Sequence, residues 1–121
     1  MLPCVSRVIG AIRYWNAVAL DANRVSHGNG ANEQTGPPLG ARALAMVHLS
    51  MHDGFTGAHG PSAKYGPYLP DLPPAPPGAS VAAAVAAAAY TALTSLFPSQ
   101  TESFDQALAD AELSGPASTM D

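Results

Sequence analysis

Alanine is the commonest apolar residue of this chain, and its abundance limits how the chain can fold. Apolar residues make up 47% of the 121 residues. Of these, 24 are alanine, whereas leucine, isoleucine, valine and phenylalanine together number 23. Alanine favours a helix but adds little apolar area to a core. We therefore expect alanine-rich helices that are stabilised by close approach to neighbouring helices.

Apolar residues recur at three- and four-residue steps in four segments, which predicts four helices. The first three cover about residues 5–25, 40–55 and 80–97, and the fourth runs from residue 99 to about residue 113. Ser80 is a good N-cap residue, Pro98 ends the third helix, and Ser99 with Glu102 has the spacing of a capping box. Nothing alternates at period two, so the predicted class is all-α, a partial bundle of two helical hairpins.

The first helix has two predicted faces. Arg7, Tyr14 and Asp21 are seven residues apart, as on a solvated face, whereas Asn16 and Asn23 project from the apolar stripe. Buried amides need partners. We favour hydrogen bonds from both asparagines to a neighbouring loop or to ordered water; the alternative is that they border a polar pocket. The predicted apolar stripe consists of Val5, Val8, Ile9, Ile12, Trp15, Ala19 and Ala22.

Residues 56–78 form a proline-rich connection with seven prolines, most of which is incompatible with a helix or a central strand. We expect an extended segment anchored on the surface by Tyr65, Tyr68, Leu69 and Leu72; a ligand for a proline-recognising module is the alternative. Residues 114–121 lack periodicity and are expected to be a disordered tail. Residues 1–121 are then one domain, which we expect to be incomplete.

Charge and cysteine content exclude several classes of protein. The net charge is −4, and five scattered basic residues form no patch for nucleic acid. The single cysteine, Cys4, excludes a disulfide framework and a multi-cysteine zinc site.

Arg7 and Arg13 interrupt the apolar start, which argues against a signal peptide. Residues 79–97 are uncharged but too rich in alanine and hydroxyl groups for a membrane span. We expect a soluble chain of unknown compartment.

Two histidines four residues apart, His48 and His52, are the candidate metal ligands. On a helix they share one flank of the apolar stripe, whereas Asp53 points about 100° further round. Zinc needs three or four protein ligands, so others would have to come from distant positions. Packing of both histidines on the flank of the helix, with backbone hydrogen bonds, is therefore the favoured interpretation. The distant positions considered are His27, Glu33, His59 and Asp105.

Other catalytic arrangements are weaker. Ser26 beside His27, or Ser50 near the paired histidines, suggests a nucleophile and a base, but no strained strand-to-helix turn exposes either serine. Cys4 is expected to be inert. The carboxylates of the fourth helix, Asp105, Asp110 and Glu112, read as a solvated face.

Four stretches together resemble the amino-terminal region of bacterial vanadium-dependent haloperoxidases, which belong with the PAP2-type acid phosphatases. They are "RVIGAIRYWNAVALDANRVSH", "NEQTGPP", "ARALAMVHLSMHDGF" and "YLPDLPPAPPGASVAAAVAAAAYTALTSLFPSQ". The most particular features are Trp15, Asn16 and Asp21 in the first stretch and the helix that carries both histidines.

The resemblance implies a helical bundle whose full-length form binds vanadate, or turns over phosphate, and oxidises halide with peroxide. The family's catalytic segments are a Lys with an Arg-Pro, a Pro-Ser-Gly-His, and an Arg followed by a His. None is present: Lys64 is the single lysine, no arginine precedes a proline, and Ala63 follows Pro61 and Ser62. No catalytic or cofactor-binding residue therefore carries over, and we expect this chain to bind no cofactor itself.

The leading hypothesis is thus an amino-terminal helical scaffold, truncated or frame-shifted, that is inactive alone. Its expected partner is the remainder of the bundle or another copy of the chain, with no role for nucleic acid or membrane. The alternatives are a small helical metal-binding protein that uses His48 and His52, or a helical interaction module.

Overall fold

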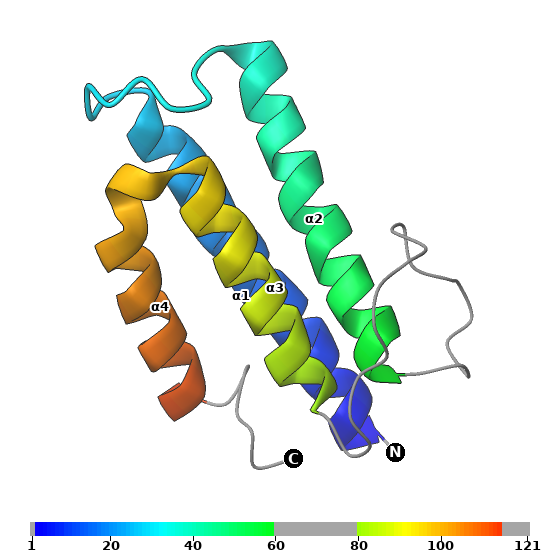
Figure 1. Ribbon diagram of the computed structural model, residues 1–121. Helices are drawn as coiled ribbons and strands as arrows, with labels where there is room; N and C mark the ends of the chain where they lie inside the picture. The colour runs from blue at the N-terminus through cyan, green and yellow to red at the C-terminus, as the bar shows by residue number, and fades with distance from the viewer. Residues whose placement is uncertain (1, 60–79, 115–121) are drawn as a thin grey trace.

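The computed structural model describes residues 2–59 and 80–114, and it is helical throughout apart from the connections. No strand occurs within these ranges, so the predicted all-α class is confirmed. The chain runs up, down, up and down through successive helices (Figure 1). The elements are α1 (Leu2–Ser26), α2 (Pro37–His59), α3 (Val81–Leu96), the short 3₁₀ helix η1 (Pro98–Gln100) and α4 (Thr101–Ser114).

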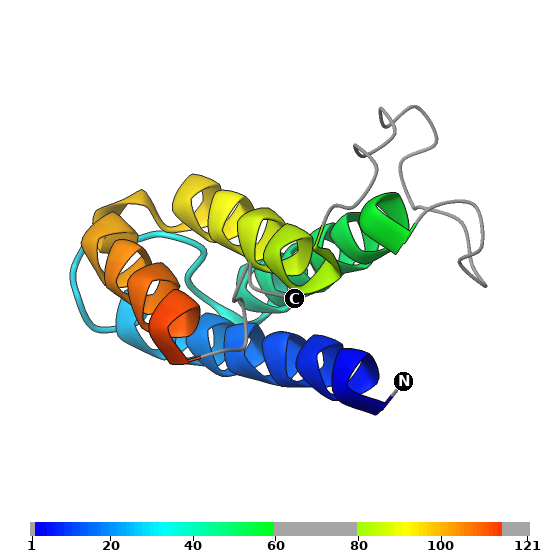
Figure 2. The same cartoon turned by 90° about the horizontal axis from the view of Figure 1, so that it is seen from below.

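Helices α1 and α3 each contact all three other helices, and α3 packs most extensively against α2. Figures 1 and 2 show α2 and α4 on opposite sides of α3, with α1 lying against its remaining side. The loop of residues 27–36 joins α1 to α2 at the end of the bundle where η1 also lies. Polar groups from three connected elements therefore meet at that end.

The core combines a few large side chains with many alanines. Trp15 from α1, Val47 from α2, Leu93 from α3 and Phe104 from α4 are all buried. Half of the sixteen buried apolar residues are alanines, as the composition suggested: Ala11, Ala19, Ala22, Ala43, Ala82, Ala86, Ala89 and Ala111.

Small residues bring the backbones of α2 and α3 close together. A Cβ atom placed on Gly54 of α2 would lie 2.8 Å from the carbonyl oxygen of Ala84 in α3. Such a separation leaves no room for a side chain larger than hydrogen. Close approach of backbones is how an alanine-rich helix pair gains dispersion contacts.

The predicted signals at both ends of α3 are confirmed. The Ser80 hydroxyl accepts a hydrogen bond from the backbone N–H of Ala83 at 3.2 Å, as an N-cap does. The helix ends at Leu96, one residue before Phe97, which caps it and precedes Pro98. Local chemistry therefore determines where this helix begins and ends.

The capping box predicted for Ser99 and Glu102 is replaced by a tertiary cap. Ser99 donates its backbone N–H to Glu33 Oε2 at 3.0 Å and its hydroxyl to Glu33 Oε1 at 2.7 Å. The carboxylate thus comes from the loop of residues 27–36. A negative charge at this position also suits the partial positive charge of the helix N-terminus.

Each of the two predicted faces of α1 is wrong at one position. Ile9 was assigned to the apolar stripe, but it is 47% exposed because it lies about 120° around the helix from Trp15. Tyr14 was assigned to a solvated face, but it is half-buried and donates its hydroxyl to the carbonyl oxygen of Ala107 at 2.6 Å. The side of α1 that carries Tyr14 therefore faces α4.

Helix α2 extends beyond the predicted residues 40–55 at both ends. Its last turn includes residues 56–59, which were assigned to the proline-rich connection. Ser114, the first residue assigned to the tail, is the last residue of α4. The rest of the connection, with its four predicted anchoring residues, and the rest of the tail lie outside the described residues.

Candidate functional site

The first candidate metal ligand, His48, is used to join two helices. Its Nε2 atom lies 2.8 Å from Oδ1 of Asn16 on α1, and its side chain is otherwise exposed. An amide oxygen only accepts, so Nε2 carries the proton and donates. Asn16 was expected to bond to a loop or to water; its partner is a histidine of the neighbouring helix instead.

The second candidate, His52, is half-buried one turn further along α2. Within residues 2–59 and 80–114, no group of three His, Cys, Asp or Glu side chains is placed to hold a metal ion. The proposed distant ligands are bonded elsewhere: His27 to Asn23, Glu33 to Ser99 and Asp105 to Tyr90. His59 falls outside the described side chains. The metal site thus stays a hypothesis that none of these contacts favours.

Asn23 and Trp15 each bury a polar atom without a hydrogen-bond partner among the described residues. These atoms are Asn23 Oδ1 and Trp15 Nε1. Oδ1 of Asn23 would lie 2.8 Å from a Cβ atom on Gly40, so the amide packs directly on the glycine. Oδ1 of this asparagine therefore makes no hydrogen bond to a loop of the described residues, and the other expected partner, ordered water, stays a prediction.

His27 connects the end of α1 with the start of α2. Its Nδ1 atom lies 2.7 Å from the carbonyl oxygen of Asn23, and its Nε2 atom accepts the backbone N–H of Gly36 at 3.0 Å. The carbonyl requires a proton on Nδ1, and the amide requires a bare Nε2. The hydrogen bonds therefore select the neutral tautomer with its proton on Nδ1.

The Ser26–His27 pair is not arranged as a nucleophile and a base. Ser26 is buried, and its hydroxyl donates to the carbonyl oxygen of Asn23 at 2.8 Å. The serine oxygen lies 3.5 Å from Nδ1 of His27, which already carries the proton. A base must accept a proton from its nucleophile, so this pair serves the turn at the end of α1.

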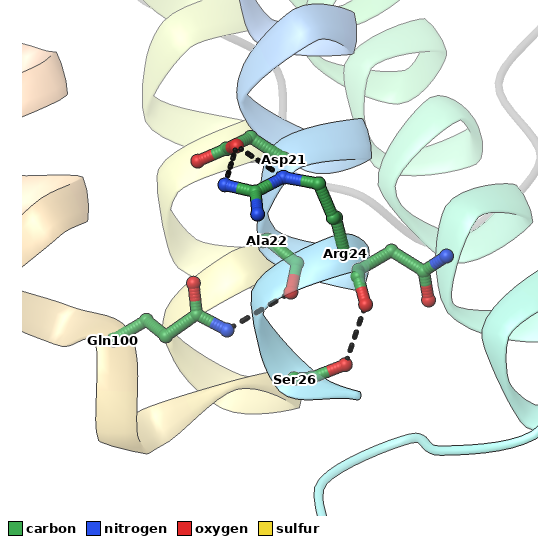
Figure 3. A network of polar contacts seen from close by, with 6 residues as sticks. Asp21, Ala22, Arg24, Ser26 and Gln100 are labelled. Atoms are coloured by element: carbon green, nitrogen blue, oxygen red, sulfur yellow. Dashed lines mark hydrogen bonds and ion pairs between the residues drawn. The ribbon is translucent and has the colours of Figure 1, made fainter. Parts of the chain in front are cut away.

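Figure 3 shows how η1 is attached to α1 at this end of the bundle. The side-chain amide of Gln100 is buried and donates to the carbonyl oxygen of Ala22 at 3.0 Å. Arg24 and Asp21 form an exposed ion pair at 2.8 Å on α1. Exposed pairs of this kind contribute little to stability. The hydrogen bond from the buried side chain of Gln100 to α1 is therefore the more important contact.

Two tyrosines hold α4 against the bundle. The Tyr90 hydroxyl donates to Asp105, and this hydrogen bond, followed by burial and by the charge of Asp105, raises the pKa of Tyr90. Burial, followed by the negative charge of Asp110, raises the pKa of Tyr14. Asp105 was predicted to be a solvated carboxylate; it is exposed, but it also accepts this bond.

An apolar groove of about 640 Å³ lies between α2 and α3. Met46, Ser50 and Gly57 line it from α2, and Ala87 and Thr91 line it from α3. Ser50 was considered as a nucleophile, but the groove places it among small apolar side chains. This face was not predicted as a site, although the uncharged run of α3 was visible in the sequence.

A model of one protein family matches almost all of the described helices. It is the vanadium chloroperoxidase N-terminal domain, and the match covers residues 9–114. The chain belongs to this family. The resemblance predicted from the sequence is confirmed, and all four helices fall within or overlap the matched range.

A curated relative is the vanadium chloroperoxidase of Curvularia inaequalis, which is 54% identical over 44 residues. The matched stretch covers 36% of this chain and 7% of the relative, so the chain spans a small part of that protein's length. The resemblance had been drawn to bacterial members, whereas this relative is fungal. No solved structure matches the chain.

The described residues of this vanadium chloroperoxidase domain do not fit a bound vanadate. An oxyanion of this kind needs several converging cationic donors. Arg24 is paired with Asp21, and Arg42 donates to Gln34 at 3.2 Å. Arg13 lies about 16 Å from Arg24 along the axis of α1. The described arginines are thus dispersed, and no step of oxidation chemistry is assigned to them.

No single helix among the described residues is long and apolar enough to cross a membrane. The bent pair of α3 with the following η1–α4 segment passes the same test of length and composition. The chain bends by 119° between the two parts of the pair.

Proposed function

We propose that this chain is the helical scaffold domain of a vanadium chloroperoxidase-type enzyme, with the vanadate-binding residues carried by another part of the polypeptide. The match of residues 9–114 to the family's N-terminal domain is the observation that supports this proposal most directly. The whole enzyme would bind vanadate and oxidise halide with peroxide, and its partner is the remainder of the helical bundle.

The side-chain chemistry supports a scaffold. The polar groups of the described residues are used between helices: His48 with Asn16, Glu33 with Ser99, and Gln100 with a backbone carbonyl. Vanadate binding would need cations that are not already paired and that point to one place. The family's Pro-Ser-Gly-His and Arg-Pro segments are also absent from the sequence.

The test combines a binding assay and an activity assay on the purified chain. The chain is incubated with vanadate, and retention of vanadium is measured by equilibrium dialysis. Halogenation of a dye is then followed with peroxide and bromide or chloride. We expect neither retention nor turnover, with the Curvularia inaequalis vanadium chloroperoxidase as the positive control. Vanadate-dependent halogenation by the chain alone would overturn the proposal.

We further propose the kinship with PAP2-type acid phosphatases, because vanadate and phosphate share a tetrahedral oxyanion geometry. The same cationic site that holds vanadate would then bind phosphate. Inhibition by phosphate of an enzyme assembled from this domain and its catalytic part tests this idea. Halogenation that is insensitive to phosphate would contradict it.

A further inference from the structure

Helix α3 exposes a face without any charge. Its sixteen residues include no acidic or basic side chain. Ala87, Thr91 and Ser95 are exposed at four-residue steps along it. The exposed face of α4, by contrast, carries Glu102 and Asp110. A helix face that stays in contact with solvent normally carries charges. The uncharged face of α3 is therefore typical of a surface that packs against another part of a protein.

The hydroxyl groups on this face are already satisfied by their own helix. Thr91 donates to the carbonyl oxygen of Ala87 at 2.8 Å, and Ser95 donates to that of Thr91 at 2.9 Å. Hydroxyls that bond back to their own helix leave no unpaired donor when the surface is buried. Removing water from this face therefore costs little free energy.

The exposed face of α3 borders the groove that it forms with α2. The floor is narrow because Gly54 approaches the backbone of Ala84. Met46 stands at the edge of the groove with 44% of its surface exposed. No described atom lies within 4 Å of a Cβ placed on Gly57, so the wall is open there. The groove volume of about 640 Å³ is large enough for a row of side chains.

We propose that this groove, between Met46–Gly57 of α2 and Ala84–Leu96 of α3, is the seat of an α-helix from the catalytic part of the same vanadium chloroperoxidase polypeptide. This inference rests on the proposed function. The chain matches an N-terminal domain, and the stretch matched in the Curvularia inaequalis relative is 7% of that protein, so most of such a polypeptide lies outside the matched stretch.

The residues that line the groove determine which side chains the docking helix can carry. Alanine and glycine walls allow two helix axes to approach closely, to about 8 Å. Apolar side chains of medium size, at three- and four-residue steps, would fill the groove between the two walls. Among the described residues, Asp53 is the one carboxylate residue that lines the groove, so an acidic side chain on the docking helix would lose its water and also meet a like charge.

The test uses Ala87→Arg and Thr91→Arg, which put bulk and charge into the groove at exposed positions. Ala109→Arg on α4 is the matched control, because Ala109 is also an exposed helical alanine. The probe is the Curvularia inaequalis vanadium chloroperoxidase without the whole region that corresponds to residues 9–114 of this chain. The full chain and the probe are produced together in one cell, so that each can fold against the other. Co-purification, mass by light scattering and binding affinity are then measured.

We expect a one-to-one complex with the unmodified chain and with Ala109→Arg. Binding by Ala87→Arg and Thr91→Arg should be weaker by roughly tenfold or more, as at the centre of an interface. The melting temperature of the chain alone should change no more in Ala87→Arg than in Ala109→Arg. A complex that tolerates both groove variants would overturn the groove as the docking site and leave the proposed function standing.

Other occupants give different results, and each would overturn the proposal. A dimer of the unmodified chain that Ala87→Arg dissociates would assign the groove to a second copy. A lower melting temperature in monomeric Ala87→Arg alone would assign the groove to residues 60–79 of the same chain. Groove-dependent binding to phosphatidylcholine vesicles would assign it to a membrane. If no complex forms even with the unmodified chain, the proposed assembly itself fails, and the groove proposal fails with it.

Discussion

Replacing Gly54 by alanine should destabilise the chain, although alanine is the better helix former. The new Cβ atom would lie 2.8 Å from the carbonyl oxygen of Ala84, 3.1 Å from the Cβ of Ala88 and 3.2 Å from the carbonyl carbon of Ala84. These are backbone atoms and a methyl group, and none can rotate away. The backbones of α2 and α3 must therefore separate by several tenths of an ångström.

The expected free-energy change is the difference between two opposing effects. Overpacking a well-packed contact costs about 1–3 kcal/mol. Alanine in place of glycine inside a helix gains up to about 1 kcal/mol. With about 2 kcal/mol for the overpacking and about 1 kcal/mol for the helix gain, the net loss of unfolding free energy should be about 1 kcal/mol. For a domain of this size, that loss lowers the melting temperature by about 4 °C or more.

Gly57 and Gly10 are the matched controls, because no described atom lies within 4 Å of a Cβ at either position. Gly57→Ala and Gly10→Ala should stabilise the chain by up to about 1 kcal/mol. The unfolding free energy of each variant is measured by urea denaturation, followed by far-ultraviolet circular dichroism. A Gly54→Ala variant that is as stable as Gly57→Ala would refute the close packing of α2 against α3.

The remaining predictions concern the polar contacts. The raised pKa values of Tyr14 and Tyr90 mean that folding favours their neutral hydroxyls, so their stabilising effect is complete below the ordinary pKa of 10.0 and is lost as the pH rises through the raised values. The urea midpoint should therefore fall above about pH 10, and less steeply in Tyr90→Phe than in the unmodified chain. Glu33→Ala should cost about 1–2 kcal/mol, because it removes the acceptor of two hydrogen bonds from Ser99; a urea midpoint equal to that of the unmodified chain would contradict the tertiary cap. Zinc should not raise the melting temperature, and a rise that His48→Gln abolishes would revive the metal-site hypothesis.

The elements of the fold follow from local signals, and the sequence predicts them well. Apolar spacing predicts the four helices, and Ser80 and Pro98 mark the limits of α3 through chemistry that acts within one turn. Resemblance to a family predicts the membership that the family match confirms. The signals for the helices share one property: each is complete within a short stretch of chain.

Contacts between distant residues were not predictable in the same way. The spacing of Ser99 and Glu102 fits a capping box, yet Glu33 supplies the carboxylate from 66 residues away. The sequence predicts a solvated Tyr14, but α4 covers this side chain, and the carbonyl oxygen of Ala107 accepts a hydrogen bond from its hydroxyl. A helical pattern shows which residues share a face, but it does not show which neighbour covers that face. The pairing of His48 with Asn16 across two helices is hidden for the same reason.

The high alanine content of the chain is related to the groove. A core in which half of the buried apolar residues are alanines removes less apolar area from water per residue than a leucine-rich core of the same size. A chain of this kind gains stability mainly by covering more of its helix faces. Helix α3, with α1, α2 and α4 around it, still exposes an uncharged face. The proposed docking helix over Ala87 and Thr91 would add apolar area that the side chains of this core do not supply, so it would also stabilise the domain.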